Sequence, residues 1–200
     1  MWTSFIKLAL VAAVFILAGC ETLPEKQATA QPVVPAGAKA TYAQAISAVK
    51  AGHDRKAIQL FSGLTREFPD FAASFTNLGL LYLKQDKLTE AEQAFMQAIT
   101  INPADAIAYN HLGVVLRQRG QFDRARQAYE NALRINASYA SAYLNLGILN
   151  DLYFQNLETA LQHYQRYQVL TGDADKQVAK WIVDLERRVN SSSNAGGKQG

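Results

Sequence analysis

Apolar and small residues recur along the chain with a fixed period between residues 72 and 150. The motifs Asn77-Leu78-Gly79, His111-Leu112-Gly113 and Asn145-Leu146-Gly147 place their glycines 34 residues apart. Each motif has aromatic or bulky apolar residues on both sides, and a second stretch with alanines around an aromatic residue follows it. Such a period predicts stacked helix–turn–helix units, because a single helix pair cannot bury its apolar face alone.

The stretch 72–105 carries the most complete form of this pattern. Its members are Phe75, Leu78, Gly79, Tyr82, Ala91, Phe95, Ala98 and Pro103. The stretch 106–139 repeats it with Ala137 in the place of the proline. The stretch from 140 returns to register only if one residue is added in the turn after Tyr153. A weaker copy over about 41–71 has Ala45 where the glycine would be. The pattern resembles that of the tetratricopeptide repeat family.

The resemblance implies an all-α, right-handed superhelical solenoid of about four repeats over residues 41–174, at about 41–71, 72–105, 106–139 and 140–174. Gly52, Asp86 and Gly120 share one repeat position, in a turn that favours a positive φ. Residues 175–190 predict a capping helix with one apolar face, formed by Val178, Trp181, Ile182 and Leu185. The tail 191–200 has the composition of a disordered segment.

The N-terminal residues predict export and attachment to a membrane. Lys7 precedes the apolar run 8–18, which is shorter than the roughly 20 residues that span a bilayer. Residues 1–19 are therefore predicted to be a signal peptide, the alternative being a retained anchor helix. Leu17-Ala18-Gly19-Cys20 resembles the bacterial lipobox, which implies a covalent lipid on Cys20, the one cysteine of the chain. Residues 20–40 then form a flexible tether, rich in Pro, Ala, Gln and Thr.

The same resemblance favours a location. Glu21 follows the lipidated cysteine, where an aspartate would indicate retention in the inner membrane. We therefore expect an outer-membrane lipoprotein that faces the periplasm. No cofactor other than the lipid is expected.

Charge and motifs argue against nucleic-acid binding and catalysis. The formal net charge of +3 falls to +2 when residues 1–19, which contain only Lys7, are removed. The chain lacks HExxH, GxSxG and P-loop motifs, and its three histidines occupy unrelated repeat positions. Glu90 and Glu92 are expected on a solvated helix face. No metal, small-molecule substrate or enzymatic activity is therefore expected. An enzyme would have to use His111, Asp151 and Arg117.

In the repeat family, the first helices line a concave groove that receives a peptide or a partner helix. The resemblance implies a protein or peptide partner in this groove, with asparagines that hydrogen-bond to an extended backbone. The alternative is that these asparagines are only polar groups on an exposed helix face. The predicted groove residues are Thr76, Asn77, Leu80, Leu83, Lys84, Asn110, His111, Val114, Arg117, Gln118, Leu144, Asn145, Ile148 and Asp151.

The predicted function is a scaffold or assembly factor of an envelope complex. One alternative is a pilotin for a type IV pilus secretin, a class of lipoprotein that combines a lipobox, a tether and stacked repeats. Another is a regulatory subunit that binds a cell-wall or polysaccharide-export enzyme. These alternatives differ in the partner, which a repeat pattern does not specify.

Overall fold

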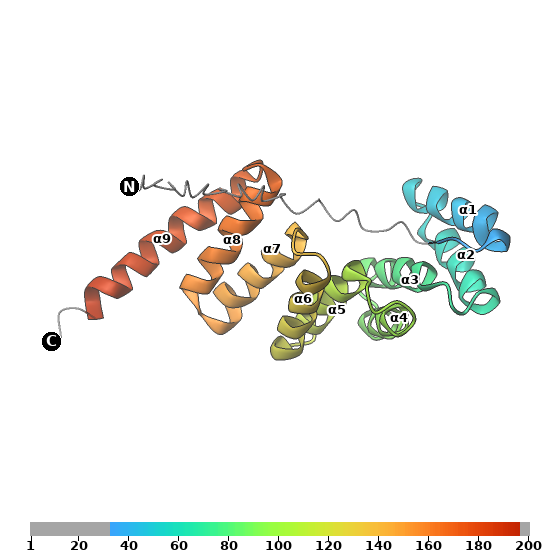
Figure 1. Cartoon of the computed structure of the whole chain (residues 1–200), viewed down its shortest axis with the longest axis horizontal. Coiled ribbons are helices and arrows are strands. Elements are labelled where there is room, and N and C mark those ends of the chain that lie inside the picture. Colours follow the sequence, from blue (N-terminus) through green and yellow to red (C-terminus); the bar gives the residue numbers. More distant parts are fainter. Residues whose placement is uncertain (1–32, 197–200) are drawn as a thin grey trace, which may run out of the picture.

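The computed structural model describes residues 33–196, and every regular element in this range is a helix (Figure 1). The elements are η1 (Ala36–Ala38), α1 (Lys39–Lys50), α2 (Asp54–Glu67), α3 (Ala72–Lys84), α4 (Leu88–Ile101), α5 (Ala106–Gln118), α6 (Phe122–Ile135), α7 (Ala140–Leu149), η2 (Asn150–Phe154), α8 (Leu157–Thr171) and α9 (Lys176–Gly196). Here η1 is a short 3-10 helix and η2 is a π-turn.

Consecutive helices form four pairs, α1–α2, α3–α4, α5–α6 and α7–α8, which follow one another along the long axis of the molecule (Figure 1). The second helix of each pair also contacts the first helix of the next pair, and α9 packs on α8 in the same way. Among the first helices, α5 contacts both α3 and α7 as well. The molecule is therefore an all-α solenoid, as the period predicts.

Each pair buries one aromatic ring from its second helix. Phe61, Phe95, Tyr129 and Tyr164 are at most 1% exposed. Such a ring buries about 150–250 Å², which corresponds to at most about 4–6 kcal/mol of hydrophobic stabilisation. A Cβ on Gly79, Gly113 or Gly147 would lie within 2.7 Å of the facing ring. The recurring glycines are thus explained by close approach of ring and backbone.

The turns within the first three pairs share one backbone conformation. Gly52 and Gly120 have φ of 73°, and Asp86 has φ of 59°. The expected positive φ at this repeat position is therefore confirmed. Glycine adopts it without a steric cost, whereas an L-residue in this region is less stable by about 1–2 kcal/mol.

The fourth pair accommodates its extra residue in the π-turn η2. Gln155 N–H donates to Asn150 O, which adds one residue to the last turn of the first helix. Gln155 then has φ of 55° and ends the helix, one position later than Gly120 does in the third pair. The predicted insertion is present, but it lies in residues 150–154 and not in a turn after Tyr153.

Both ends of the solenoid differ from the prediction. Val34 packs against the first core cluster and Ala38 is fully buried, so the end of the predicted tether belongs to the folded body. At the other end α9 continues to Gly196, so residues 191–196 are helical where disorder was expected. The face of α9 is also narrower than predicted, since Val178 and Leu185 are buried but Trp181 is 37% exposed.

The predicted signal peptide, Cys20 and the tether up to residue 32 lie outside the described residues. No helix within residues 33–196 combines the length and the apolar character that a membrane crossing requires.

Candidate functional site

The predicted groove residues come from three first helices, which lie next to one another in the solenoid. Thr76 to Lys84 belong to α3, Asn110 to Gln118 belong to α5, and Leu144 to Ile148 belong to α7. Asp151 lies in η2, directly after α7. The repeat period therefore brings this set to neighbouring helices, but the helices bury its members to different depths.

Two asparagines join neighbouring first helices. Asn77 Nδ2 donates to Ala73 O at 2.7 Å and to the Tyr42 hydroxyl of α1 at 3.3 Å. Asn145 Nδ2 of α7 donates to Asn110 Oδ1 of α5 at 2.9 Å. The amide groups that we expected to bind a partner backbone thus already bind groups of this chain. Both amide groups thus connect neighbouring repeats.

Thr76 and Asn110 are corrections to the predicted groove. Thr76 is 6% exposed and Asn110 is 1% exposed. The Thr76 hydroxyl donates to Asp105 Oδ2 at 2.7 Å, and Asp105 Oδ1 in turn caps α5 by accepting from Ala108 N–H at 2.9 Å. Both residues face the next first helix and not the outer surface, so a partner does not reach them.

His111 occupies the same repeat position as Asn77 and Asn145 but lacks their bond between helices. Its ring stacks on Phe95, with centroids 5.9 Å apart and planes 19° apart. Its buried Nδ1 has no hydrogen-bond partner among the described residues. Burial lowers the pKa of His111, and the negative charge of Asp105 offsets only part of this effect. The imidazole is accordingly neutral at pH 7.

On α7, the predicted residues Leu144 and Ile148 pack against a core cluster to which α8 contributes Ala160 and Tyr164 and α9 contributes Val178 and Leu185. Both residues are half-buried. Asp151 forms an ion pair with Arg188 of α9 at 3.1 Å. The last helix therefore shares a core with the fourth repeat.

The remaining predicted residues of α3 and α5 are half-buried or exposed, and Leu80, Leu83 and Val114 among them also pack against core clusters. We call them the first-helix surface: Leu80, Leu83, Lys84, Val114, Arg117 and Gln118. Lys84 and Gln118 are exposed, and the other four are half-buried. Lys84 also forms an ion pair with Asp54 at 2.7 Å, with 60% of its own side chain exposed. The surface thus combines apolar side chains with polar ends.

Models of the tetratricopeptide repeat match residues 42–106 and 94–127, and a model described as TPR repeat matches residues 114–150. The chain is a tetratricopeptide repeat protein. No curated protein matches its sequence.

Solved structures show the same fold at low sequence identity. The structure of MamA residues 41-end from Desulfovibrio magneticus RS-1 has a TM-score of 0.68 at 17% identity, covering 82% of this chain and 92% of that one. A MamA RS-1 double mutant has a TM-score of 0.61 at 21% identity, covering 70% and 78%. The first TPR domain of Spaghetti (RPAP3), bound to an HSP90 peptide, has a TM-score of 0.56 at 21% identity, covering 60% and 95%.

In this tetratricopeptide repeat protein, the first-helix surface has two charged residues, Lys84 and Arg117. Arg117 is the one that has no carboxylate partner among the described residues. Its Nε is buried and makes no hydrogen bond there. Burial lowers the pKa of Arg117, but the adjacent hydroxyl oxygens of Tyr129 and Tyr153 outweigh this effect and raise it. The guanidinium is therefore held charged beside two phenol groups.

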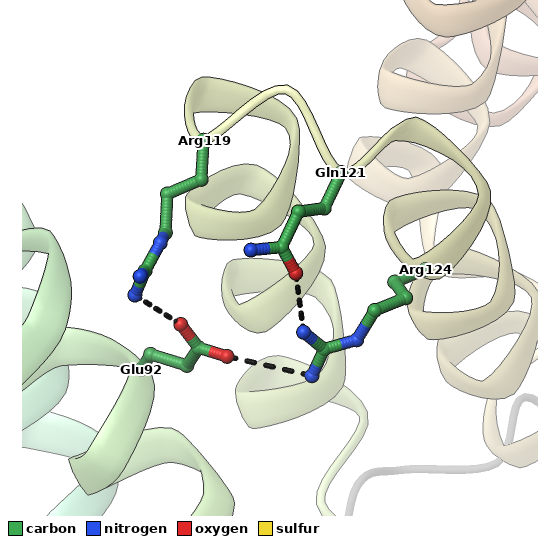
Figure 2. A network of polar contacts seen from close by, with 4 residues as sticks. All are labelled: Glu92, Arg119, Gln121 and Arg124. Atoms are coloured by element: carbon green, nitrogen blue, oxygen red, sulfur yellow. Dashed lines mark hydrogen bonds and ion pairs between the residues drawn. The ribbon is translucent and has the colours of Figure 1, made fainter.

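Glu92 forms an interaction between repeats that the sequence did not predict. Only 13% of its side chain is exposed, where a solvated face was expected. Its carboxylate binds Arg119 Nη1 at 2.5 Å and Arg124 Nη2 at 3.4 Å, and Gln121 accepts a hydrogen bond from Arg124 (Figure 2). The network ties α4 to the α5–α6 turn. Its partners lie 27 and 32 residues away, and a local charge pattern does not reveal such distant pairs.

The residues that an enzyme would have to use, His111, Asp151 and Arg117, lie in separate surroundings. Residues 33–196 contain no group of three His, Cys, Asp or Glu side chains that could hold a metal ion. Asp151 is paired with Arg188, and Arg117 lies against tyrosine hydroxyls. These three residues thus contact different neighbours. The repeats are typical of proteins that bind other proteins.

Proposed function

We propose that this chain is a lipid-anchored scaffold of the bacterial envelope, whose repeats bind a protein partner through the first-helix surface. The observation that carries the proposal is the first-helix surface itself, where half-buried apolar side chains of α3 and α5 lie on the same helices as the exposed Lys84 and Gln118. Half-buried apolar side chains beside exposed polar ones suit a peptide or helix that buries an apolar face.

A structural neighbour supports a peptide partner. The first TPR domain of Spaghetti (RPAP3) is bound to the HSP90 peptide SRMEEVD, and it is similar to this chain over 60% of its length. On the first-helix surface of our chain, Leu80, Leu83 and Val114 offer apolar contacts, and Arg117 offers a cation. A partner segment with a bulky apolar residue beside an acceptor would match both.

The membrane part of the proposal rests on the N-terminal sequence alone. The positive residue, the short apolar run and the motif Leu17-Ala18-Gly19-Cys20 together suit export and lipidation. One acyl chain binds a membrane only weakly and reversibly, whereas two hold a protein stably. With a diacylglycerol on Cys20, residues 21–33 would connect the repeats to the periplasmic face of the outer membrane.

The partner can be identified by affinity capture. Residues 21–200 carrying a C-terminal tag are exposed to a detergent-solubilised envelope extract of the source cells. A parallel sample carries Lys84→Ala, Val114→Ser and Gln118→Ala together. A matched control carries Gln97→Ala and Arg134→Ala, both exposed on second helices. We expect a partner that the control retains and the triple variant loses.

Equal capture by all three proteins would exclude the first-helix surface as the binding site. A secretin among the retained proteins would favour the pilotin alternative, and a cell-wall enzyme would favour the regulatory subunit. Circular dichroism at 222 nm checks that the triple variant keeps its helices.

Lipidation is tested separately in cells given a radiolabelled fatty acid. The full chain should carry the label and fractionate with the outer membrane. The Cys20→Ser variant should lose the label. Label retained by Cys20→Ser would contradict the anchor, without bearing on the first-helix surface.

A further inference from the structure

The π-turn η2 gives the fourth repeat an edge that the other repeats lack. Twelve residues separate the motif glycine from the next buried alanine in the second and third repeats, but thirteen separate Gly147 from Ala160. Gln155 follows the π-turn with φ of 55°, a positive φ that the turn residues of the other repeats also have. Single π-turns inside α-helices are frequent at functional sites.

The π-turn exposes two large side chains at the boundary between the third and fourth repeats. Leu152 is 63% exposed and Tyr153 is 41% exposed. The Tyr153 ring packs on Phe122 of α6, with centroids 4.3 Å apart. Phe154 packs against the core cluster beneath it. We call Phe122, Leu152, Tyr153 and Phe154 the π-turn edge.

Two arginines border this edge. The Arg126 guanidinium lies 4.9 Å from the centre of the Phe154 ring, in the geometry of a cation–π contact. The carboxylate that Arg126 binds is that of Asp123, at 2.8 Å, and 77% of the Asp123 side chain is exposed. Arg117, which is half-buried, lies beside Tyr153. The one acidic residue of the π-turn, Asp151, is paired with Arg188. The edge is therefore apolar in its centre, and of the two guanidinium groups beside it, that of Arg126 is paired with Asp123 and that of Arg117 has no carboxylate partner among the described residues.

We infer that the π-turn edge is a second docking surface, which binds an acidic segment of a partner protein that also carries a bulky apolar side chain. Leu152 and Tyr153 would cover the apolar side chain, and Arg126 would bind a carboxylate beside it. An anionic lipid headgroup is also negative. However, Arg117 is half-buried, and a carboxylate on a flexible side chain reaches it more readily than a headgroup in a flat membrane does.

Arg117 belongs to the first-helix surface and also lies beside the π-turn edge, but Leu152 and Arg126 lie outside the first-helix surface, so variants of these two residues test the edge separately. It is tested with the full chain in detergent micelles and the fluorescent nonapeptide GEEFGEEFG, acetylated and amidated so that no terminal carboxylate contributes. The peptide GQQFGQQFG is the uncharged control. Binding is followed by fluorescence anisotropy at low and high salt.

We expect the glutamate peptide to bind more tightly than the glutamine peptide, and the difference to shrink as salt screens the charges. Arg126→Gln should weaken binding about tenfold, which corresponds to about 1.4 kcal/mol. Leu152→Ser should weaken it about fivefold, a common size for one exposed interface contact. The matched control Val169→Ser changes a side chain on α8 that is 65% exposed, and binding should be unchanged.

Equal binding of the two peptides would overturn the inference, as would equal effects of Leu152→Ser and Val169→Ser. Displacement of the peptide by dihexanoyl-phosphatidylglycerol but not by dihexanoyl-phosphatidylcholine would instead assign the edge to anionic lipid, against the inference. The variant with Lys84→Ala, Val114→Ser and Gln118→Ala should still bind the peptide. A failure of the first-helix surface is thus distinguished from a failure of the π-turn edge.

Discussion

The contact between Gly113 and Tyr129 allows the packing argument to be tested with one methyl group. A Cβ at Gly113 would lie 2.5 Å from Tyr129 Cε1, 2.6 Å from Cδ1 and 2.9 Å from Cζ. Carbon atoms in contact prefer about 3.5–4.0 Å, so the ring has to move by about 1 Å. Tyr129 is fully buried against Leu116, Ala125 and Leu146, so this movement displaces its neighbours.

The expected cost follows from two opposing effects. Overpacking a core by one methyl group costs about 1–3 kcal/mol. Replacing a glycine inside a helix by alanine gains about 1 kcal/mol of helix propensity. Gly113→Ala should therefore destabilise the protein by up to about 2 kcal/mol. The first repeat carries Ala45 at this position, so the change should repack the core and not unfold it.

Gly63→Ala in α2 is the matched control, because nothing lies within 4 Å of a Cβ at that position. It should gain the helix propensity alone, about 1 kcal/mol. In thermal unfolding followed by circular dichroism at 222 nm, Gly113→Ala should lower the Tm by up to about 8 °C, whereas Gly63→Ala should raise it by about 2–4 °C. A higher Tm for both variants would contradict the argument, because it would show that the Tyr129 ring leaves room for a Cβ at residue 113.

Three further predictions concern charges and backbone. Glu92→Gln should lower the free energy of unfolding in urea by about 1 kcal/mol at low salt; a loss that persists in 1 M NaCl would not come from the ion pairs. Asp86→Gly should raise the Tm by removing a strain of about 1 kcal/mol at positive φ, whereas Gln85→Gly should lower it. Burial lowers the pKa of His111, so the unfolded chain binds its proton more tightly and stability is lost as pH falls below about 6.5. His111→Gln should reduce this loss between pH 7.5 and pH 5, measured by urea unfolding, and an unchanged loss in that variant would contradict the prediction.

The sequence predicts the features of the fold that recur with the repeat. The glycine contacts of Gly79 and Gly113, and the positive φ of Asp86, each follow from a repeat position. A residue that obeys the period meets the same neighbours in every repeat. The one departure from the period, the insertion in the fourth repeat, is predicted to within a few residues, but its form as a π-turn is not.

The candidate site is predicted less well, because position on a helix does not determine depth. Thr76 and Asn110 lie on the predicted face, yet the next first helix covers them. Leu144 and Ile148 lie on the same face of α7, but the last helix packs against their cluster. Which side of a helix a residue occupies follows from a 3.6-residue period, whereas what covers that side depends on contacts far along the chain.

The position of the π-turn edge has a consequence for how a partner can bind. Arg117 of the first-helix surface lies beside Tyr153 of the π-turn edge. The π-turn edge continues onto α6, because the Tyr153 ring packs on Phe122. A partner that used both surfaces would bury more area than on either one, and linking two weak contacts raises affinity well beyond either one. Combining Gln118→Ala with Arg126→Gln should then weaken such a partner by more than the factor for either change alone.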